Sequence, residues 1–198
     1  TLVRAAGATE DTAKAGSIAS IAAMLFAVPF LIAPGQFGAI SDRFSKRSVA
    51  LAMKYFEIAI MAFAGIAFFT AQPVLLWGTL FLLAVHSAQF GPCKYGIIPE
   101  SVPEEKLSMV NGMVQASTMI AVVAGGGLAG PLFVFLYNRD AVYLASPIMV
   151  LLSFCGLVAA HRMFAPPAAH PGQRIPLNPY HGLGDHLRIF WKDRWLGL

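Results

Sequence analysis

Long apolar runs, separated by short charged or Pro/Gly-containing breaks, dominate the hydrophobic pattern of this chain. Each run approaches or exceeds the roughly 20 residues with which an α-helix crosses a hydrocarbon core about 30 Å thick. The runs do not alternate polar and apolar positions, so helices rather than barrel strands are predicted to satisfy the backbone in lipid. The expected membrane-crossing helices are 17–40, 49–70, 74–98, 107–137 and 141–164.

The segments outside these runs are expected to be loops and linkers. Residues 1–16 are expected to form an outer loop, whereas residues 165–198 are expected to form a cytoplasmic linker, because its first part, 165–184, is rich in Pro, Gly and His. The fourth run is overlong, so we expect it to tilt, bend or begin outside the hydrocarbon. Apolar residues near the end recur at helical spacing and predict a short interfacial helix; they are Leu187, Phe190, Trp191, Trp195 and Leu198.

Composition excludes an ordinary soluble domain. Of the 198 residues, 57% are hydrophobic and only 12% charged, against about 25% charged in typical soluble domains. Mean hydropathy is +0.66. Cys93 and Cys155 lack CxxC spacing and a histidine at metal-ligand distance, so we expect no disulfide framework, metal or cofactor. A nucleic-acid partner is not expected either.

Basic residues predict the orientation. If the segment from Asp42 to Lys46 is cytoplasmic, 11 of the 14 Lys and Arg residues fall on the cytoplasmic side, leaving Arg4, Lys14 and Arg139 outside. This distribution follows the positive-inside rule. The chain starts at Thr1 and stops as a new apolar segment begins, so we expect it to be a piece of a longer protein.

Charged residues within the apolar runs are candidate functional residues, because charges in a bilayer are costly. Glu57 lies ten residues past Arg47, roughly 15 Å along a helix, and Lys54 is close enough on the same face to pair with it. The two form either a structural ion pair or part of a polar pathway. His86, with Gln89 one turn later, is either hydrogen-bonded to a neighbouring helix or part of a proton relay.

Lys94 lies near the end of its run. Its position alone favours a side chain that reaches the headgroups, but Pro92 can bend the helix and direct Lys94 into the bundle.

Polar residues open the fourth run, and glycines recur later within it. The polar residues either join helices or line a cavity; they are Asn111, Gln115, Ser117 and Thr118. Gly126 and Gly130, followed by Pro131, are four residues apart and predict close helix packing.

The loop after the first run resembles a motif of the major facilitator superfamily: Gly38, three residues, Asp42, Arg43 and two further bases, Lys46 and Arg47. The resemblance implies a latch in which Asp42 and these bases contact an opposite helix bundle and hold one conformation closed. Ser45 stands where the superfamily usually has glycine.

The block from Phe90 to Glu100 resembles the Gly-Pro-x-Lys-Tyr-Gly-Ile block of bacterial lysophospholipid transporters, which occur alone or fused to an acyltransferase. The segment 111–118, the glycine pair and the proline-rich linker extend this similarity. It implies an all-α membrane protein comprising helices 2 to 6 of the N-terminal six-helix bundle, with a missing C-terminal bundle as partner. Lys94 would contact the lipid headgroup or a gate, and family members commonly carry an acid where this chain has Gln115.

The implied function is lysophospholipid transport across the bacterial inner membrane for re-acylation, with membrane lipids and possible acyltransferase domains, in cis or in trans, as partners. Two alternatives stay open. The longer protein could also be an enzyme, with a fused acyltransferase and acyl-ACP synthetase, although nothing in these residues is catalytic. Alternatively, the carrier could export drugs or small solutes.

Overall fold

The computed structural model describes residues 2–172 and 174–175, with side chains described from residue 14 onward. The described residues form helices and no strand, as expected for an all-α membrane protein. The α-helices are α1 (Leu2–Ile32), α2 (Pro34–Arg43), α3 (Lys46–Thr70), α4 (Pro73–Ser101), α5 (Leu107–Tyr137) and α6 (Ala145–His161); the short 3-10 helices are η1 (Glu104–Lys106) and η2 (Val142–Leu144).

Five of the described helical segments are long and apolar enough to cross a membrane, so the number of spans predicted from sequence is confirmed. The segments are Lys14–Ile32, Lys46–Thr70, Pro73–Ser101, Glu104–Tyr137 and Val142–His161. The predicted interfacial helix at 187–198 lies outside the described residues.

The first span departs from the prediction at both ends. Residues 2–16, expected as a loop, are helical; the segment contains five alanines and no proline, and alanine has the highest helix propensity. The expected helix 17–40 is broken at Ala33, where φ is −129° and α2 begins with Pro34. Pro34 has no N–H to continue the hydrogen bonding of α1, so α2 starts as a separate helix.

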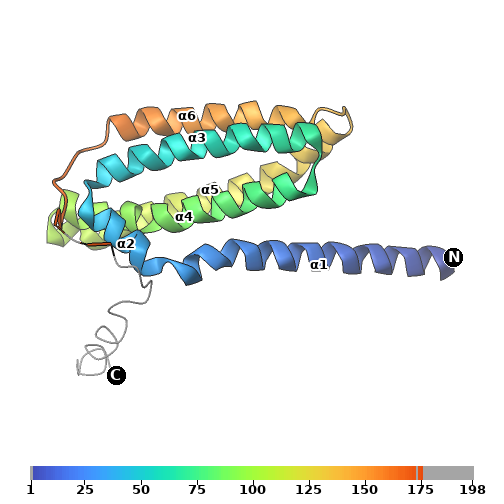
Figure 1. Ribbon diagram of the computed structural model, residues 1–198, viewed down its shortest axis with the longest axis horizontal. Coiled ribbons are helices and arrows are strands. Elements are labelled where there is room, and N and C mark those ends of the chain that lie inside the picture. Colours follow the sequence, from blue (N-terminus) through green and yellow to red (C-terminus); the bar gives the residue numbers. More distant parts are fainter. Residues whose placement is uncertain (1, 173, 176–198) are drawn as a thin grey trace, which may run out of the picture.

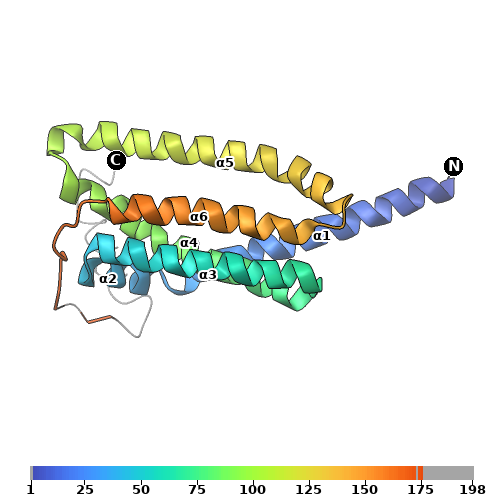
Figure 2. The same cartoon turned by 90° about the horizontal axis from the view of Figure 1, so that it is seen from above.

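The helices run alternately up and down. α3 packs between α4 and α6, and α1 with α2 lies along α4 (Figure 1). Seen from above, α5 stands apart from α3 and bends near its C-terminal end (Figure 2), in the part of the helix that contains Pro131. A bend is one of the three possibilities expected for the overlong fourth run, beside a tilt or a start outside the hydrocarbon.

Two sharp reversals connect the ends of the spans away from the α2–α3 junction. Ala71 ends α3 with φ 50°, and Asp140 has φ 52° in the loop between α5 and η2. Aspartate tolerates this left-handed conformation better than most residues. The short loops therefore place α4 beside α3 and α6 beside the end of α5.

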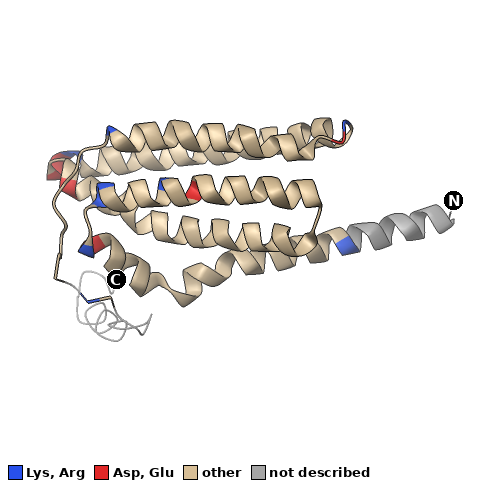
Figure 3. Cartoon of the chain, turned by 45° about the horizontal axis from the view of Figure 1, so that its top comes forward, with Lys and Arg blue, Asp and Glu red and all other residues tan. Residues whose placement is uncertain are grey.

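Charged residues gather at one end of the bundle, where α2 meets α3 and α4 meets α5, apart from one pair within α3 and a few at the opposite end (Figure 3). The α2–α3 junction, the α4–η1 connection and the end of α6 share that end. They supply the residues of the candidate site.

Candidate functional site

The α2–α3 junction is built by a tight change of backbone direction. Phe44 is extended, with φ −111° and ψ 157°. Ser45 then caps α3, because its Oγ accepts the N–H of Ser48 at 3.2 Å. Serine is among the preferred N-cap residues. Lys46 thus becomes the first residue of α3 and turns toward the neighbouring helices.

Lys46 is the central cation of the junction and is only 2% exposed. Its Nζ donates to the Ser41 carbonyl at 2.7 Å and to Asp42 Oδ1 at 3.0 Å. It also lies 3.2 Å from Glu100 Oε1 at the end of α4. Three acceptors satisfy this buried ammonium group. Losing any one of them would destabilise the fold, because the desolvation of the charge would no longer be compensated.

One face of α4 packs against the α2–α3 junction. Gln89 Nε2 donates to the Phe37 carbonyl and to Ser41 Oγ, each at 3.2 Å. Cys93 Sγ donates to the Lys46 carbonyl at 3.1 Å. A Cβ built at Gly96 would lie 3.0 Å from Lys46 Cε. With Glu100, these positions repeat every three or four residues and so share one helix face.

The other residues of the predicted latch contact different parts of the structure. Arg47 donates to the His161 carbonyl at 2.6 Å and so contacts the end of α6. Arg43 is exposed, and its guanidinium lies 5.6 Å from the centre of the Phe44 ring. A Cβ at Gly38 would meet nothing within 4 Å. Asp42 therefore has Lys46 as its partner, while Arg43 and Arg47 contact other groups.

The linker after α6 lies against this junction. The N–H of His170 donates to the Asp42 carbonyl at 2.8 Å, Pro166 is buried, and Met163 packs against the core formed by Val49, Ala50 and Cys93. Together with the Arg47–His161 contact, these observations attach residues 161–170 to the start of α3.

A second polar group joins α4 to α5. Lys94 Nζ donates to Thr118 Oγ1 and lies 5.3 Å from the centre of the Tyr95 ring. Tyr95 donates its hydroxyl to Gln115 Oε1 at 2.7 Å. Lys94 thus contacts the neighbouring helix, as expected if it is directed into the bundle. Asn111, grouped with Gln115 in the prediction, is exposed.

A third group joins α3, α4 and α6 around Glu57. Lys54 Nζ lies 2.7 Å from Glu57 Oε2, so the predicted pairing of these residues is present. Ser153 donates to Glu57 Oε1 at 2.8 Å. His86 Nε2 lies 3.4 Å from Glu57 Oε2 but makes no hydrogen bond among the described residues.

Four of the five predicted substrate-pathway residues therefore separate into two groups, and the fifth, Asn111, is exposed. Lys94 and Gln115 make contacts between α4 and α5, whereas Lys54 and Glu57 make contacts toward α6 and His86. The α3–α6 seam continues along the helices, since Ser146 donates to the Met61 carbonyl at 2.6 Å. This geometry favours the structural interpretation of the Lys54–Glu57 pair over the pathway interpretation.

The predicted glycine packing seam has no partner among the described helices. A Cβ at Gly126 or Gly130 would meet nothing within 4 Å. The short α5–η2 loop carries the chain to α6, which packs on α3, and α5 keeps only a few contacts with α4. Pro131 ends this glycine-rich segment without bringing another described helix against it.

Sequence reasoning missed three partners of the candidate residues. The motif resemblance gives Glu100 no role, but the spacing of Gln89, Cys93, Gly96 and Glu100 is enough to place it on the face of α4 that meets Lys46. Thr118 is one of several polar residues at the start of the fourth run, and its spacing alone does not single it out as the partner of Lys94. Ser153 lies seven residues after Ser146, a helical repeat that could have indicated a shared face.

Comparisons with known proteins agree with the motifs. The profile of the Major Facilitator Superfamily matches residues 5–198. A lysophospholipid transporter LplT from Klebsiella pneumoniae subsp. pneumoniae is 28% identical over 173 residues, which cover 86% of this chain and 40% of the relative. The LplT of Salmonella paratyphi B is 31% identical over 152 residues, 76% of this chain and 35% of the relative. The chain thus spans well under half the length of these relatives.

Proposed function

Since this chain belongs to the major facilitator superfamily, we propose that it forms most of the first helix bundle of a lysophospholipid carrier, a multi-pass protein of the bacterial inner membrane. The carrier would work by alternating access, with its other helices outside this chain. The similarity to proteins named lysophospholipid transporter supports this substrate class.

The observation that carries the proposal is the position of Lys94. A lysine near a helix end could extend to the membrane surface at little cost, but Lys94 instead binds Thr118 on α5, close to the Tyr95–Gln115 hydrogen bond. A lysophospholipid needs a polar contact for its phosphate and an apolar path for its single acyl chain. Lys94 supplies a mobile point charge for the phosphate, and the exposed face of α5 supplies apolar side chains.

The α2–α3 junction is the proposed latch of the carrier. Alternating access needs contacts that form in one conformation and break in the other. Arg47 Nε and Glu100 Oε2 are buried but lack hydrogen-bond partners among the described residues. Buried polar atoms are rarely left without partners, but both atoms are already covered within this chain, so an opposite bundle could contact them only once the junction opens.

The test is translocation of lysophosphatidylethanolamine by the full-length protein in vesicles. Lys94→Ala should slow translocation at least tenfold while expression and folding are retained, because the phosphate loses its cation. Lys106→Ala, which removes an exposed base beyond the end of α4, is the matched control and should leave the rate unchanged. Unchanged translocation by Lys94→Ala would remove this residue from the mechanism.

A further inference from the structure

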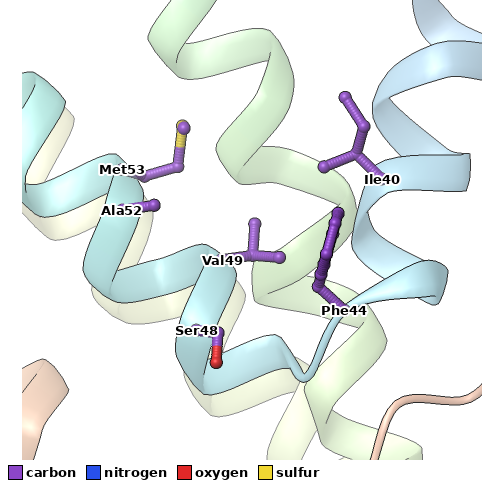
Figure 4. A pocket seen from close by; sticks show the side chains of 6 residues that line it. All are labelled: Ile40, Phe44, Ser48, Val49, Ala52 and Met53. Atoms are coloured by element: carbon purple, nitrogen blue, oxygen red, sulfur yellow. The ribbon is translucent and has the colours of Figure 1, made fainter. Parts of the chain in front are cut away.

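An apolar cavity separates α2 from α3 just inside the charged junction. It has a volume of about 290 Å³ and is lined by Ile40, Phe44, Ser48, Val49, Ala52 and Met53. Figure 4 shows Ile40 and Phe44 on one wall and Val49 and Met53 on the other, with the side chains of the two walls turned toward each other. Its size is close to the lower limit of ligand-binding pockets, which are also mostly apolar.

The opening of the cavity carries polar and charged groups, whereas its walls are mostly apolar. Phe44 is 48% exposed and lies two residues before Lys46, where the second span begins. The guanidinium of Arg43 lies against the ring of Phe44. On the other side, the hydroxyls of Ser45 and Ser48 are 2.7 Å apart. An apolar cavity thus opens beside a cation and two hydroxyls at the edge of the membrane span.

Arg43 is the exposed base of the junction, and the other two bases there are engaged by protein groups. Three bases, Arg43, Lys46 and Arg47, face two acids, Asp42 and Glu100. Lys46 is buried between both acids, and Arg47 donates to the His161 carbonyl. The net charge of the group is therefore positive, and its exposed cation lies beside Phe44.

We propose that this cavity, which we call the α2–α3 slot, binds one acyl chain of an anionic phospholipid from the surrounding leaflet, with the phosphate against Arg43. The slot matches an acyl chain in its apolar walls. Arg43 and the serine hydroxyls match a phosphate in charge and hydrogen bonding, and basic residues at the membrane surface attract anionic lipids.

This phospholipid is a bound partner and not the transported substrate. The slot is formed by α2 and α3, whereas Lys94 and its partners join α4 to α5. The inference therefore does not depend on the proposed function. Because Phe44 and Ser48 of the slot flank the Asp42–Lys46 contact, an occupied slot would stabilise the junction.

Photo-crosslinking of the full-length protein tests the proposal. A benzophenone amino acid replaces Phe44, the protein is reconstituted in equimolar phosphatidylglycerol and phosphatidylcholine, and the adducts are identified by mass spectrometry after irradiation. Phosphatidylglycerol adducts should exceed phosphatidylcholine adducts about fivefold, the factor that one basic residue near an anionic surface contributes. Arg43→Gln should bring the two adducts to parity.

A second variant and a matched probe distinguish lipid bound in the slot from nonspecific labelling by the surrounding bilayer. Ala52→Phe fills the slot and should reduce both adducts at position 44 without affecting a probe at Phe135, where Arg139 lies 3.9 Å from the ring centre in a similar cation–ring pair. Excess lysophosphatidylethanolamine should leave labelling at position 44 unchanged.

Three outcomes would overturn the proposal: equal labelling by the two lipids, adducts with another part of the polypeptide or a second copy, or loss of label on adding lysophosphatidylethanolamine. The last would make the slot a substrate site. A failure of transport would leave the proposal intact, because crosslinking is measured without transport.

Discussion

Lys46 Nζ lies 3.2 Å from Glu100 Oε1, which joins the first residue of α3 to the last turn of α4. The contact spans two segments that resemble separate family motifs, the loop from Gly38 to Arg47 and the block from Phe90 to Glu100. The two motifs therefore form one structural unit at this end of the bundle, with Lys46 as its shared cation. The same cation also holds Asp42 at 3.0 Å.

Replacing Lys46 should destabilise this end of the bundle. Lys46→Ala leaves Asp42 and Glu100 without their common cation, and hydrogen bonds to charged groups contribute about 1.5–3 kcal/mol each. We expect a loss of about 2–3 kcal/mol, measured as the free energy of unfolding in mixed micelles. Arg43→Ala removes an exposed base of the same junction and should change stability by less than about 0.5 kcal/mol. Equal losses in the two variants would contradict a special role for Lys46.

Adding a side chain at Gly96 should destabilise the protein, because Gly96 lies against the side chain of Lys46. A glycine-to-alanine change inside a helix ordinarily stabilises by about 1 kcal/mol, and Gly112→Ala, where a Cβ would meet nothing within 4 Å, should show that gain. At Gly96 the new Cβ would lie 3.0 Å from Lys46 Cε, and overpacking costs about 1–3 kcal/mol. Gly96→Ala should therefore be less stable than Gly112→Ala by about 2 kcal/mol in the same unfolding measurement; a matching gain at both glycines would contradict the packing argument.

The number of membrane helices could be predicted from the sequence because hydrocarbon thickness sets a length that the apolar runs display directly. Contacts within one helix were also predictable, as the Lys54–Glu57 pair shows, because helical spacing fixes which residues are neighbours. The helix at residues 2–16 could not be predicted from hydrophobicity, because polar residues interrupt the apolar pattern there. Its alanine content, which favours a helix, was the signal that remained.

Contacts between helices were less predictable, because they depend on how each helix rotates and which neighbour it meets. Glu100 and Ser153 are single polar residues whose partners lie 54 and 96 positions away in the sequence. The glycine spacing at Gly126 and Gly130 predicts close packing, but it does not specify a partner. Among the described residues, no helix occupies that position.

The Glu57 cluster should behave as a structural connection between α3 and α6. Ser153→Ala removes the hydroxyl that donates to Glu57 Oε1 and should cost about 1.5–3 kcal/mol of stability, because the acceptor is charged. Ser146→Ala removes a bond on the same seam to the neutral Met61 carbonyl and should cost about 1 kcal/mol. Transport by both variants should stay near the wild-type rate at temperatures where they are folded. A large transport defect in Ser153→Ala alone would instead indicate a polar pathway.

Thr118 should position Lys94 for its substrate. Thr118→Val keeps the shape of the side chain but removes the hydroxyl that binds Lys94 Nζ, so lysophospholipid translocation should fall about threefold to tenfold. Ser117→Ala is the control, because Ser117 Oγ donates only to the Val114 carbonyl of its own helix. Translocation rates in vesicles check this prediction. An equal effect of the two substitutions would show that loss of any hydroxyl in this part of α5 is harmful.

The linker contact at His170 should protect the junction from proteolysis. His170→Pro removes the N–H that donates to the Asp42 carbonyl, whereas His170→Ala retains it. Limited trypsin digestion should therefore cut after Arg162 several times faster in His170→Pro than in His170→Ala or wild type. Identical digestion rates would show that this hydrogen bond does not hold the linker in place.

The most direct test of the central claim is lysophospholipid movement by the full-length protein in vesicles of defined lipid. Labelled lysophosphatidylethanolamine added to one leaflet should become protected from extraction by albumin faster than in protein-free vesicles. An amphipathic drug cation in excess should not slow this movement. Protection at the protein-free rate, or transport of the drug cation in place of the lipid, would contradict the account.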